Sequence, residues 1–552
     1  MALAQTAIQG ADLAPLFEKA QAAHRDGALA QAEKRYKAVL ARDPAHVGAL
    51  HLLGYLNYQA GRPAQAMHYL TQALKQNGNS SELLSTYGLV LHTLGRLDEA
   101  LTHYDAALAL APGDADLINR RGTAWLRLGR AEEALAAFDR VLACDPQHVD
   151  ALGNRGNALV ALNRPEEAIA SYDAAMHAGG ESAQLLTNRA HALRRLDRLD
   201  DAVADLTRAL ARDANFAEAT FELALAQLAR GDTAEGWSNY ERRWQTGAFA
   251  GHRRDFKSPL WTGAQSLKGR TILLHAEQGF GDAIQFVRYA PLVAERGASV
   301  VLEVQPELAR LMESVAGVAR VVARGDKLVP FDLHCPLMSL PRAFGTSVAT
   351  VPAAIPYLRV GAAEVTAWAA RLPQGRPRIG ICWAGRSSHS NDSNRSLPLA
   401  RFADVWAGID ADVVSLQYPP SDEERALLQR RGVVDVSAHL HDFTDTAALI
   451  ENLDLVVSVD TAIVHLAGAL AVPTLLMLPF AADFRWLRER TDSPWYPNAE
   501  LFRQPRFADW QPVIEEVRGH LALVLATRRP SLSHPAPKRA RPPAGELPEA
   551  AP

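Results

Sequence analysis

A spacing of 34 residues recurs through the first 240 residues, and no other feature of the sequence limits its fold as much. Turn-forming residues recur at Gly27, Gly61, Gly95, Gly129, Asn163, Asp197 and Gly231. Small residues recur at Gly54, Gly88, Gly122, Gly156 and Ala190, and bulky ones at Tyr36, Leu70, Tyr104, Phe138, Tyr172, Leu206 and Tyr240. A fixed interval kept over seven units predicts a row of units in which each packs on its neighbours.

Each interval has the length and composition of two antiparallel helices joined by a short turn. Glycine, asparagine and aspartate tolerate the left-handed backbone that such a turn needs. The small residues allow the two helices to approach closely, and Pro44, Pro112 and Pro146 end the second helix of their units. This is the tetratricopeptide repeat pattern, so we expect an α-solenoid over residues 11–245.

Solenoids of this kind bind partners on a concave face lined by the first helix of each unit. Asn154 and Asn188 precede the small residue of their units by two positions, where an amide can pair with a peptide backbone. They resemble part of the asparagine ladder with which O-GlcNAc transferases grip a peptide. Arg121, Arg155 and Arg189 stand one position later and suit acidic groups. A peptide-binding face and an ordinary solvated helix surface both remain open.

The second half of the chain alternates short apolar runs with helical stretches. The runs are TILLHAE, SVVLEV, RIGICWAG, DVVSLQ, LDLVVSVD and PTLLMLP. Continuous apolar runs are typical of buried parallel strands, so we expect doubly wound α/β structure. The break LPQGRP at 372–377 predicts two Rossmann-type lobes, 246–372 and 373–526. The proline-rich segment 527–552 has little to bury, and we expect a disordered tail there.

Composition excludes several classes of function. The 552 residues carry a net charge of −4, which provides no basic field for nucleic acid. The sequence contains neither a signal peptide pattern nor an apolar run long enough to span a membrane. Cys144, Cys335 and Cys382 are too scattered for a disulfide framework or a zinc site. We therefore expect a cytoplasmic protein without a transmembrane segment.

Three loops after buried strands carry candidate chemistry, because ligands of such sheets bind beyond the carboxyl ends of strands. The first loop runs from Glu277 to Asp282 and contains Gly279 and Gly281. A dinucleotide fingerprint would need a third glycine where Ile284 stands, which argues against NAD. Asp282 can cap the following helix, or it can act as a general base, and the two roles are compatible.

The other two loops belong to the second predicted lobe. Residues 386–398 form a polar loop containing Arg395, which suits either a phosphate site or a plain surface loop. Gln417 ends another strand and should face the rim of the same predicted ligand site as this loop. In the third loop, the free amides of Thr461 and Ala462 begin a helix and predict an anion site. The flanking side chains of this loop are Asp460, which can cap the helix, and His465, one turn further on.

Together these loops resemble the heptosyltransferase-like glycosyltransferases, from about residue 271 to about residue 524. The most specific segment is SVDTAIVHLAGALAVPT at 458–474, which is similar to the Asp-Thr-x-x-x-His segment of that family. The pair Gly281 and Asp282 matches its N-terminal Gly-Asp. Arg395 stands where the family has a lysine for the donor phosphate.

The resemblance implies the two-lobed GT-B fold and an inverting, metal-independent transfer from a nucleotide-diphosphate sugar, without a further cofactor. Asp282 would take the proton of the acceptor. Arg395 and the amides of Thr461 and Ala462 would receive the leaving diphosphate. Residues for the rest of the donor would be Asp460, His465 and Gln417. Trp495 and Tyr496 either stack on a base or sugar, or simply pack.

Three functions fit this sequence. The first is a glycosyltransferase whose acceptor is a protein or peptide held on the concave face of the repeats. The second is a glycosyltransferase for a glycan or lipid, with the repeats used for assembly. The third is a scaffold with a degenerate transferase domain. Repeat arrays often associate with themselves, so self-association is a further expectation.

Overall fold

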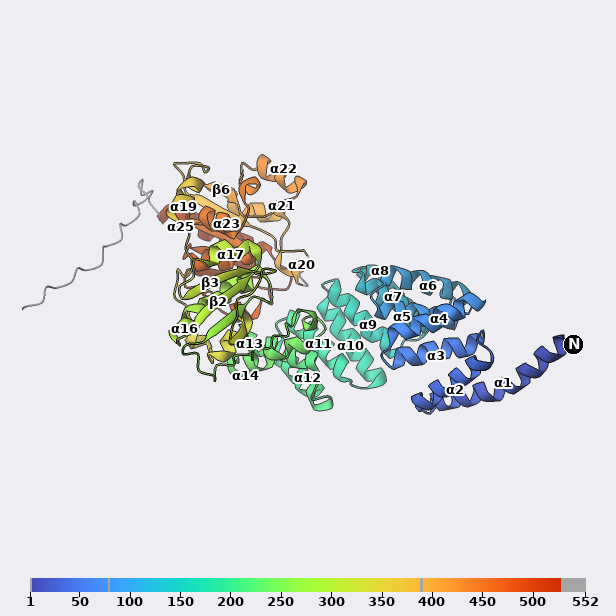
Figure 1. The fold of residues 1–552 in the computed structure, drawn as a ribbon. Coiled ribbons are helices and arrows are strands. Elements are labelled where there is room, and N and C mark those ends of the chain that lie inside the picture. The colour runs from blue at the N-terminus through green and yellow to red at the C-terminus, as the bar shows by residue number, and fades with distance from the viewer. Residues whose placement is uncertain (1, 78–79, 388–390, 528–552) are drawn as a thin grey trace, which may run out of the picture. The chain divides into compact units, whose positions relative to one another are not determined.

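The computed structural model describes residues 2–77, 80–387 and 391–527. Contacts between residues divide the chain into two compact units, 1–219 and 220–552 (Figure 1). The tail predicted for 527–552 lies outside the described residues, apart from Thr527 at the end of the last helix. Within the described part, no helix has the length and apolarity that crossing a bilayer requires.

The first unit consists of helical hairpins, as the spacing predicts. The hairpins are α1(Ala2–Arg25) with α2(Leu29–Arg42), α3(Val47–Gln59) with α4(Pro63–Asn77), α5(Ser81–Thr93) with α6(Leu97–Leu110), α7(Ala115–Arg127) with α8(Ala131–Cys144), α9(Val149–Ala161) with α10(Pro165–Gly179), and α11(Ala183–Arg195) with α12(Leu199–Arg212). Their turn residues have the expected left-handed backbone, with φ of 58° at Asn163 and 55° at Asp197.

The small and bulky residues of one unit touch each other, which explains why they recur together. A Cβ added at Gly122 on α7 would lie 2.6 Å from a ring carbon of Phe138 on α8. Gly88 and Tyr104 have the same relation, at 2.7 Å. Each ring therefore lies directly over the glycine of its own hairpin, and the two helices can approach only because that Cβ is missing.

The repeat spacing continues into the second unit. Helices α13(Ala217–Arg230) and α14(Thr233–Tyr240) form one more hairpin, followed by the 3₁₀ helices η1(Glu241–Gln245) and η2(Ala250–His252). The sequence placed the end of the repeats at residue 245, whereas contacts divide the chain at 219/220 and group this hairpin with the α/β lobes.

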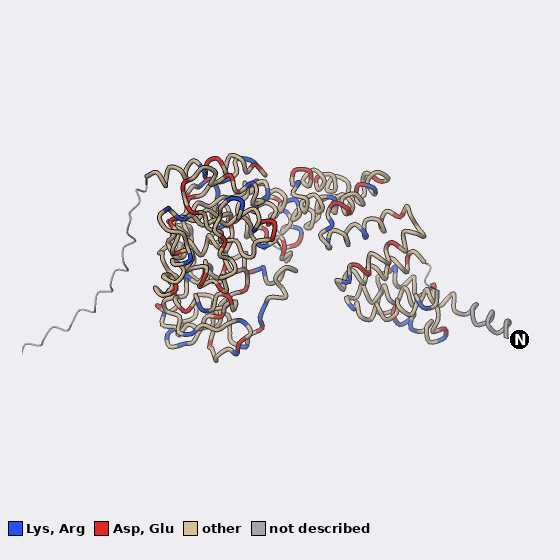
Figure 2. The backbone as a smooth tube through the Cα atoms, turned by 90° about the horizontal axis from the view of Figure 1, so that it is seen from above, with Lys and Arg blue, Asp and Glu red and all other residues tan. Residues whose placement is uncertain are grey.

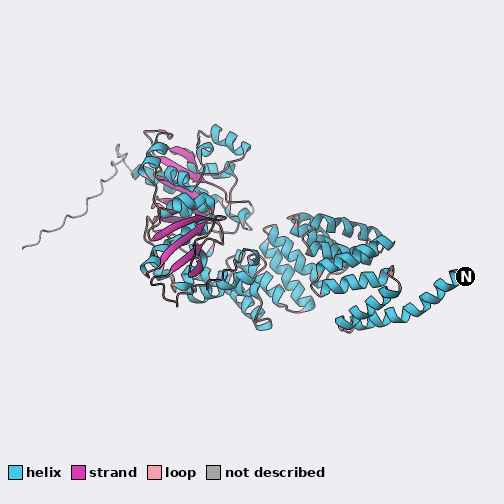
Figure 3. Ribbon diagram, viewed as in Figure 1, coloured by secondary structure: helices cyan, strands magenta, loops and turns pink. Residues whose placement is uncertain are grey.

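The first lobe has a parallel sheet of four strands in the order β3-β2-β1-β4. Its strands are β1(Thr271–His275), β2(Ser299–Val304), β3(Val318–Ala323) and β4(Leu333–Pro336). Its helices are α15(Phe280–Phe286), η3(Val287–Tyr289), α16(Ala290–Glu295), α17(Pro306–Met312), η4(Leu337–Ser339), α18(Leu340–Ala343) and η5(Val348–Thr350). In Figure 3 both sheets of this unit lie among covering helices.

The second lobe has a parallel sheet of six strands in the order β10-β9-β8-β5-β6-β7. Its strands are β5(Arg378–Cys382), β6(Asp412–Ser415), β7(Val434–Asp435), β8(Leu455–Val459), β9(Thr474–Leu478) and β10(Ala499–Arg503). Its helices are α19(Ala362–Ala369), α20(Asp392–Arg395), α21(Leu399–Phe402), η6(Ala403–Trp406), α22(Asp422–Arg430), η7(Ser437–His439), α23(Phe443–Ile450), α24(Ala462–Ala469), η8(Phe484–Trp486) and α25(Gln511–Thr527). The predicted α-solenoid followed by two Rossmann-type lobes is confirmed.

The chain crosses between the lobes before the break that the sequence suggested at 372–377. Helix α19 packs on α23 of the second lobe, and the side-chain amide of Asn452 donates to the carbonyl of Val365 at 2.9 Å. Earlier still, the backbone amide of Tyr357 donates to the carbonyl of Ala469 at 3.0 Å. Figure 2 shows positive and negative residues interspersed along both units, in keeping with the small net charge.

The contact of Gly122 with Phe138 predicts that Gly122→Ala destabilises the repeats. Overpacking costs about 1–3 kcal/mol, against a gain of up to ~1 kcal/mol in helix propensity. Chemical denaturation should show a net loss of about 1–2 kcal/mol in the unfolding free energy of the first unit. Gly113→Ala is the matched control, because a Cβ there meets nothing within 4 Å. Adding Phe138→Leu should restore the stability of Gly122→Ala, since another unit has Ala190 at the small position and Leu206 at the bulky position. Equal stability of Gly122→Ala and Gly113→Ala contradicts the argument.

Candidate functional site

The N-termini of two helices from different lobes face each other at the centre of the second unit. Helix α15 begins after the loop that follows β1, and α24 begins directly after β8. A Cβ added at Gly281 would lie 2.7 Å from Cδ2 of His465 and 3.5 Å from Cα of Ala462. The missing side chain of Gly281 therefore lets the two helices meet, and it brings the loop of Asp282 and the start of α24 into one site.

Asp282 is the third residue of α15, and both of its carboxylate oxygens have partners. Oδ2 accepts the backbone N–H of Gly279 at 2.9 Å, which makes a capping interaction across the first turn. Oδ1 accepts a hydrogen bond from the guanidinium of Arg485, which comes from η8 in the other lobe. The side chain of Asp282 is 22% exposed, so the carboxylate is partly open to solvent. Its capping role and its predicted role as a base are thus compatible.

Arg485 joins the two lobes and was not anticipated from the sequence. Its Nε donates to Oε1 of Gln285 at 2.6 Å, and its Nη1 donates to Oδ1 of Asp483 at 2.7 Å. The pKa of Arg485 is raised because the charges of Asp483 and Asp282 outweigh the effect of burial. A guanidinium with two carboxylate partners is a fixed positive charge where the two lobes meet.

Arg395 lies at the point where the strand order of the second sheet reverses. β5 and β8 are neighbours there, and the loops that follow them turn to opposite sides. The Nη1 of Arg395 donates to the carbonyl of Asp460 at 3.1 Å, and the guanidinium lies against Gly385, where a Cβ would approach to 2.4 Å. Residues 388–390 of this predicted phosphate loop lie outside the described residues.

The two residues that flank this point hold the backbone in place. Oε1 of Gln417 accepts the amide of Ala384 at 3.1 Å and the thiol of Cys382 at 3.4 Å, so Gln417 fixes the start of the loop after β5. Thr461, rather than Asp460, caps α24: its hydroxyl accepts the amide of Ile463 at 3.3 Å. The Asp460 side chain is therefore not needed for the cap.

His465 is buried with defined partners. Its Nδ1 lies 2.9 Å from the hydroxyl of Tyr496, and its ring stacks on Trp486 with centroids 5.6 Å apart. Burial, helped by the charge of Arg485, lowers the pKa of His465 to about 3, so the imidazole is neutral at physiological pH. Its ring faces Gly281 of α15.

Two carboxylates near Arg485 and Arg395 influence each other. Burial and the charge of Asp483 raise the pKa of Asp460, while Arg395 lowers it. Burial would also raise the pKa of Asp483, but Arg485 overcomes that effect and lowers it. The site therefore contains one carboxyl group, Asp460, that takes up a proton more readily than an ordinary aspartate.

The aromatic residues Trp495 and Tyr496 pack in the hydrophobic core. Both are buried, with 5% and 0% of their surface exposed. Tyr496 covers Gly468, and the carbonyl of Trp495 accepts a hydrogen bond of 2.7 Å from Arg288. Of the two roles left open by the sequence, the structure supports packing.

Sequence reasoning missed Arg485 and Asp483, although a signal was present. Both follow β9, which was recognised as a strand, and the rule that ligands gather beyond carboxyl ends of strands applies to that loop too. The loop was passed over because its chemistry depends on Asp282, about 200 residues away. In the described part of the chain, no three histidine, cysteine or acidic side chains are grouped as metal ligands would be.

The asparagines of the repeats bridge successive units. The amide of Asn154 donates to Oδ1 of Asn119 and that of Asn188 to Oδ1 of Asn157, both at 3.0 Å. The neighbouring arginines pair with acidic residues of the preceding hairpin, as Arg155 on α9 does with Asp139 on α8 at 2.7 Å. A peptide that binds here has to compete with these interactions.

Comparisons with known proteins find repeats followed by a transferase domain along the chain. Residues 17–81, 58–115, 119–183 and 187–249 match the tetratricopeptide repeat model, and residues 352–478 match that of glycosyltransferase family 9 (heptosyltransferase). The latter match contains Arg395, Gln417, Asp460, Thr461, Ala462 and His465, whereas Asp282 and Arg485 lie outside it. The chain thus carries tetratricopeptide repeats in its N-terminal part and a glycosyltransferase family 9 domain in its C-terminal part.

One curated relative is Protein FlbA of Caulobacter vibrioides, 27% identical over 331 residues. The match covers 55% of this chain and 54% of FlbA, so it spans about half the length of that relative. Among solved structures, a tetratricopeptide repeat protein from Parabacteroides merdae is 20% identical, with a TM-score of 0.38, covering 43% of this chain and 93% of that one. YrrB, a TPR protein with an unusual peptide-binding site, is 23% identical, with a TM-score of 0.29, covering 33% and 95%.

The low pKa of His465 predicts an acid-sensitive contribution to stability. Between pH 3 and 6.5 the unfolded chain binds a proton that the folded chain excludes, so this group makes unfolding free energy rise with pH across that window. Its slope is at most ~1.4 kcal/mol per pH unit. The raised pKa values of Asp460 and Glu277 act in the opposite direction, so wild type must be compared with His465→Gln. The unfolding free energy, measured by chemical denaturation at several pH values, should rise more steeply with pH for wild type than for His465→Gln. Equal slopes for the two proteins contradict the burial of a neutral imidazole.

Proposed function

We propose that this protein is a glycosyltransferase that moves a sugar from a nucleotide-diphosphate sugar to an acceptor, with inversion and without a metal ion. The observation that carries the proposal is the meeting of α15 and α24, because it brings the loop of Asp282 close to the start of α24, where we propose an anion site. The nucleotide sugar is a co-substrate, and we propose no further cofactor.

In this mechanism, Asp282 removes the proton from the acceptor as it attacks the anomeric carbon. The guanidinium of Arg485 and the amide of Gly279 hold the carboxylate in a fixed orientation. A base that is already oriented needs no reorganisation when the acceptor arrives, and this lowers the barrier. Because Arg485 also binds Gln285, the base keeps its position relative to both lobes.

Negative charge develops on the departing diphosphate on the opposite side of the sugar. The free amides of Thr461 and Ala462, the dipole of α24 and the guanidinium of Arg395 stabilise that charge. Arg395 provides the positive charge that a metal ion provides in other transferases. A base in one lobe and an anion site in the other suit a single displacement, which inverts the anomeric configuration.

The remaining residues of the site position the rest of the donor. His465, neutral and held by Tyr496, can bond a sugar or ribose hydroxyl, and Asp460 lies two residues before the first residue of α24. Gln417 holds the loop after β5 and stands at the nucleotide rim. Self-association through the repeats stays a prediction. We place the reaction in the cytoplasm, since Cys144, Cys335 and Cys382 are all free thiols.

The acceptor in this proposal is a protein or peptide held by the repeats. A solenoid next to a transferase supplies a binding surface, and the polar row that contains Asn154 and Asn188 offers amides to a peptide backbone. Mass spectrometry of cellular proteins from a deletion strain should then show the loss of sugar additions. If proteins are unchanged and a glycan or lipid loses its sugar instead, the acceptor assignment is wrong.

Asp282→Asn should abolish transfer while leaving nucleotide binding intact. Loss of a general base lowers kcat by about 10²–10⁴-fold, and the groups that bind the diphosphate lie in the other lobe. Turnover of ADP-, GDP- and UDP-linked hexoses and calorimetric titration with the corresponding diphosphates measure the two effects. Asp326→Asn, at an exposed turn after β3, is the control. Wild-type rates in Asp282→Asn exclude this residue as the base.

A further inference from the structure

A second buried carboxylate stands at the start of the loop that carries Asp282. Glu277 lies two residues beyond the end of β1, and its side chain is only 2% exposed. Its Oε1 accepts a hydrogen bond of 3.1 Å from Nη2 of Arg243, while its Oε2 has no hydrogen-bond partner among the described residues. A buried carboxylate is stable only when a positive charge lies close by, so Glu277 depends on Arg243.

Arg243 does not come from either lobe. It lies on η1, which directly continues the last repeat-like helix α14, and none of its surface is exposed. It also binds Oε1 of Glu241 at 2.9 Å and the hydroxyl of Ser339, after β4, at 2.8 Å. One guanidinium thus ties η1 to the ends of two neighbouring strands of the first lobe.

The next loop residue, Gln278, is anchored to α14, the helix that η1 continues. The side-chain amide of Gln278 donates to the hydroxyl of Tyr240 at 2.8 Å, and the backbone carbonyl of Gln278 accepts a hydrogen bond of 2.7 Å from Gln305. Tyr240 occupies the bulky position of its repeat unit, as Tyr172 does two units earlier. In this last unit the hydroxyl serves the loop of the lobe instead of another repeat helix.

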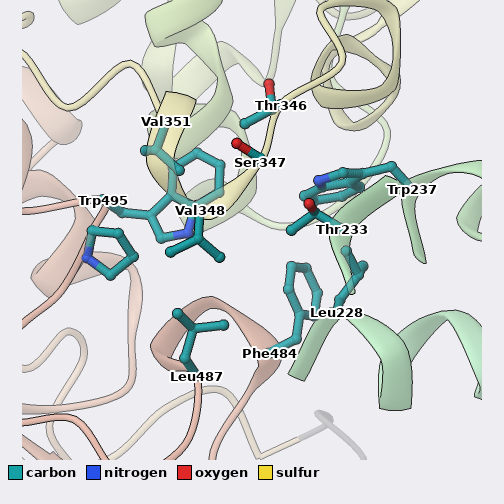
Figure 4. A pocket seen from close by; sticks show the side chains of 11 residues that line it. Leu228, Thr233, Trp237, Thr346, Ser347, Val348, Val351, Phe484, Leu487 and Trp495 are labelled. Atoms are coloured by element: carbon teal, nitrogen blue, oxygen red, sulfur yellow. The ribbon is translucent and has the colours of Figure 1, made fainter. Parts of the chain in front are cut away.

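The hairpin α13–α14 also supports the segment that carries Arg485. Phe484 packs against Trp237 and Tyr240, with ring centroids 5.6 Å and 6.2 Å apart. Figure 4 shows Trp237 and Phe484 on one side of an apolar hollow that is closed by Val348 and Leu487. Residues of this hairpin and of both lobes belong to one continuous hydrophobic core.

We propose that Arg243 and Tyr240 are positioning residues for transfer, so that the last repeat-like hairpin is part of the catalytic unit. They hold Glu277 and Gln278, and through Phe484 they support Arg485, so both halves of the Asp282–Arg485 pair rest on this hairpin. Burial and the nearby charge of Asp282 raise the pKa of Glu277 to about 7, which agrees with a carboxylate packed close to that pair. This inference rests on the proposed function of Asp282.

Full-length Tyr240→Phe and Arg243→Gln test this role kinetically. Tyr240→Phe removes one hydrogen bond and should lower kcat about three- to tenfold. Arg243→Gln removes the guanidinium and should lower kcat on the order of a hundredfold, and Arg243→Lys should restore part of the loss. KM for the nucleotide sugar should stay unchanged, since the residues that bind the diphosphate in the proposed mechanism are Arg395 and those at the start of α24. Tyr172→Phe is the matched control, because its hydroxyl binds Asn157 at 2.7 Å within the repeats. Equal kcat in Tyr240→Phe and Tyr172→Phe overturns the proposal.

Amide hydrogen exchange separates this inference from the proposed function, because it needs no turnover. In Arg243→Gln, the backbone amides of residues 278–286 should exchange faster than in wild type, whereas those of residues 462–469 should exchange at the wild-type rate. In the Tyr172→Phe control, both segments should exchange at the wild-type rate. Unchanged exchange at 278–286 contradicts the positioning role. Wild-type protein that neither binds ADP, GDP or UDP nor turns over their sugars contradicts the proposed function instead.

Discussion

The site depends on the contact of Arg485 with Asp282, which joins a side chain after β9 to a side chain before β2. Gly281 makes this contact possible, because any side chain at that position would push α15 away from His465. The same approach places the start of α24 opposite Asp282. The loop of Asp282 and the start of α24 thus come together through one missing Cβ and one guanidinium, and neither feature is visible in a single segment of the sequence.

Charged groups continue from this pair in both directions, and each lies near a group of opposite sign. On one side Asp483, Asp460 and Arg395 lead to the switch point of the larger sheet. On the other side Glu277 and Arg243 lead into the helix that continues the repeats. Few of these groups are open to water, so each depends on its neighbour, and a change at one position shifts the protonation of the next. The charged groups around Asp282 and Arg485 therefore interact electrostatically with Arg243, which follows the last hairpin.

The sequence predicted the interior of each sheet but not its borders. All six apolar runs became strands, β1, β2, β5, β6, β8 and β9, because a strand covered on both faces must be apolar throughout. The four that were missed, β3, β4, β7 and β10, are all edge strands. The repeat interval fixed the hairpins for a similar reason, since every unit meets the same neighbours. Arg485 and Arg243 escaped notice because their roles arise only from contacts distant in the chain.

A crystal structure of the full chain with a bound nucleoside diphosphate tests the central claim most directly. The account predicts the diphosphate at the amides of Thr461 and Ala462, within hydrogen-bond distance of the Arg395 guanidinium, on the side of the cleft that Asp282 faces. A nucleotide bound away from the start of α24, or a diphosphate separated from Asp282 by the body of a lobe, contradicts it.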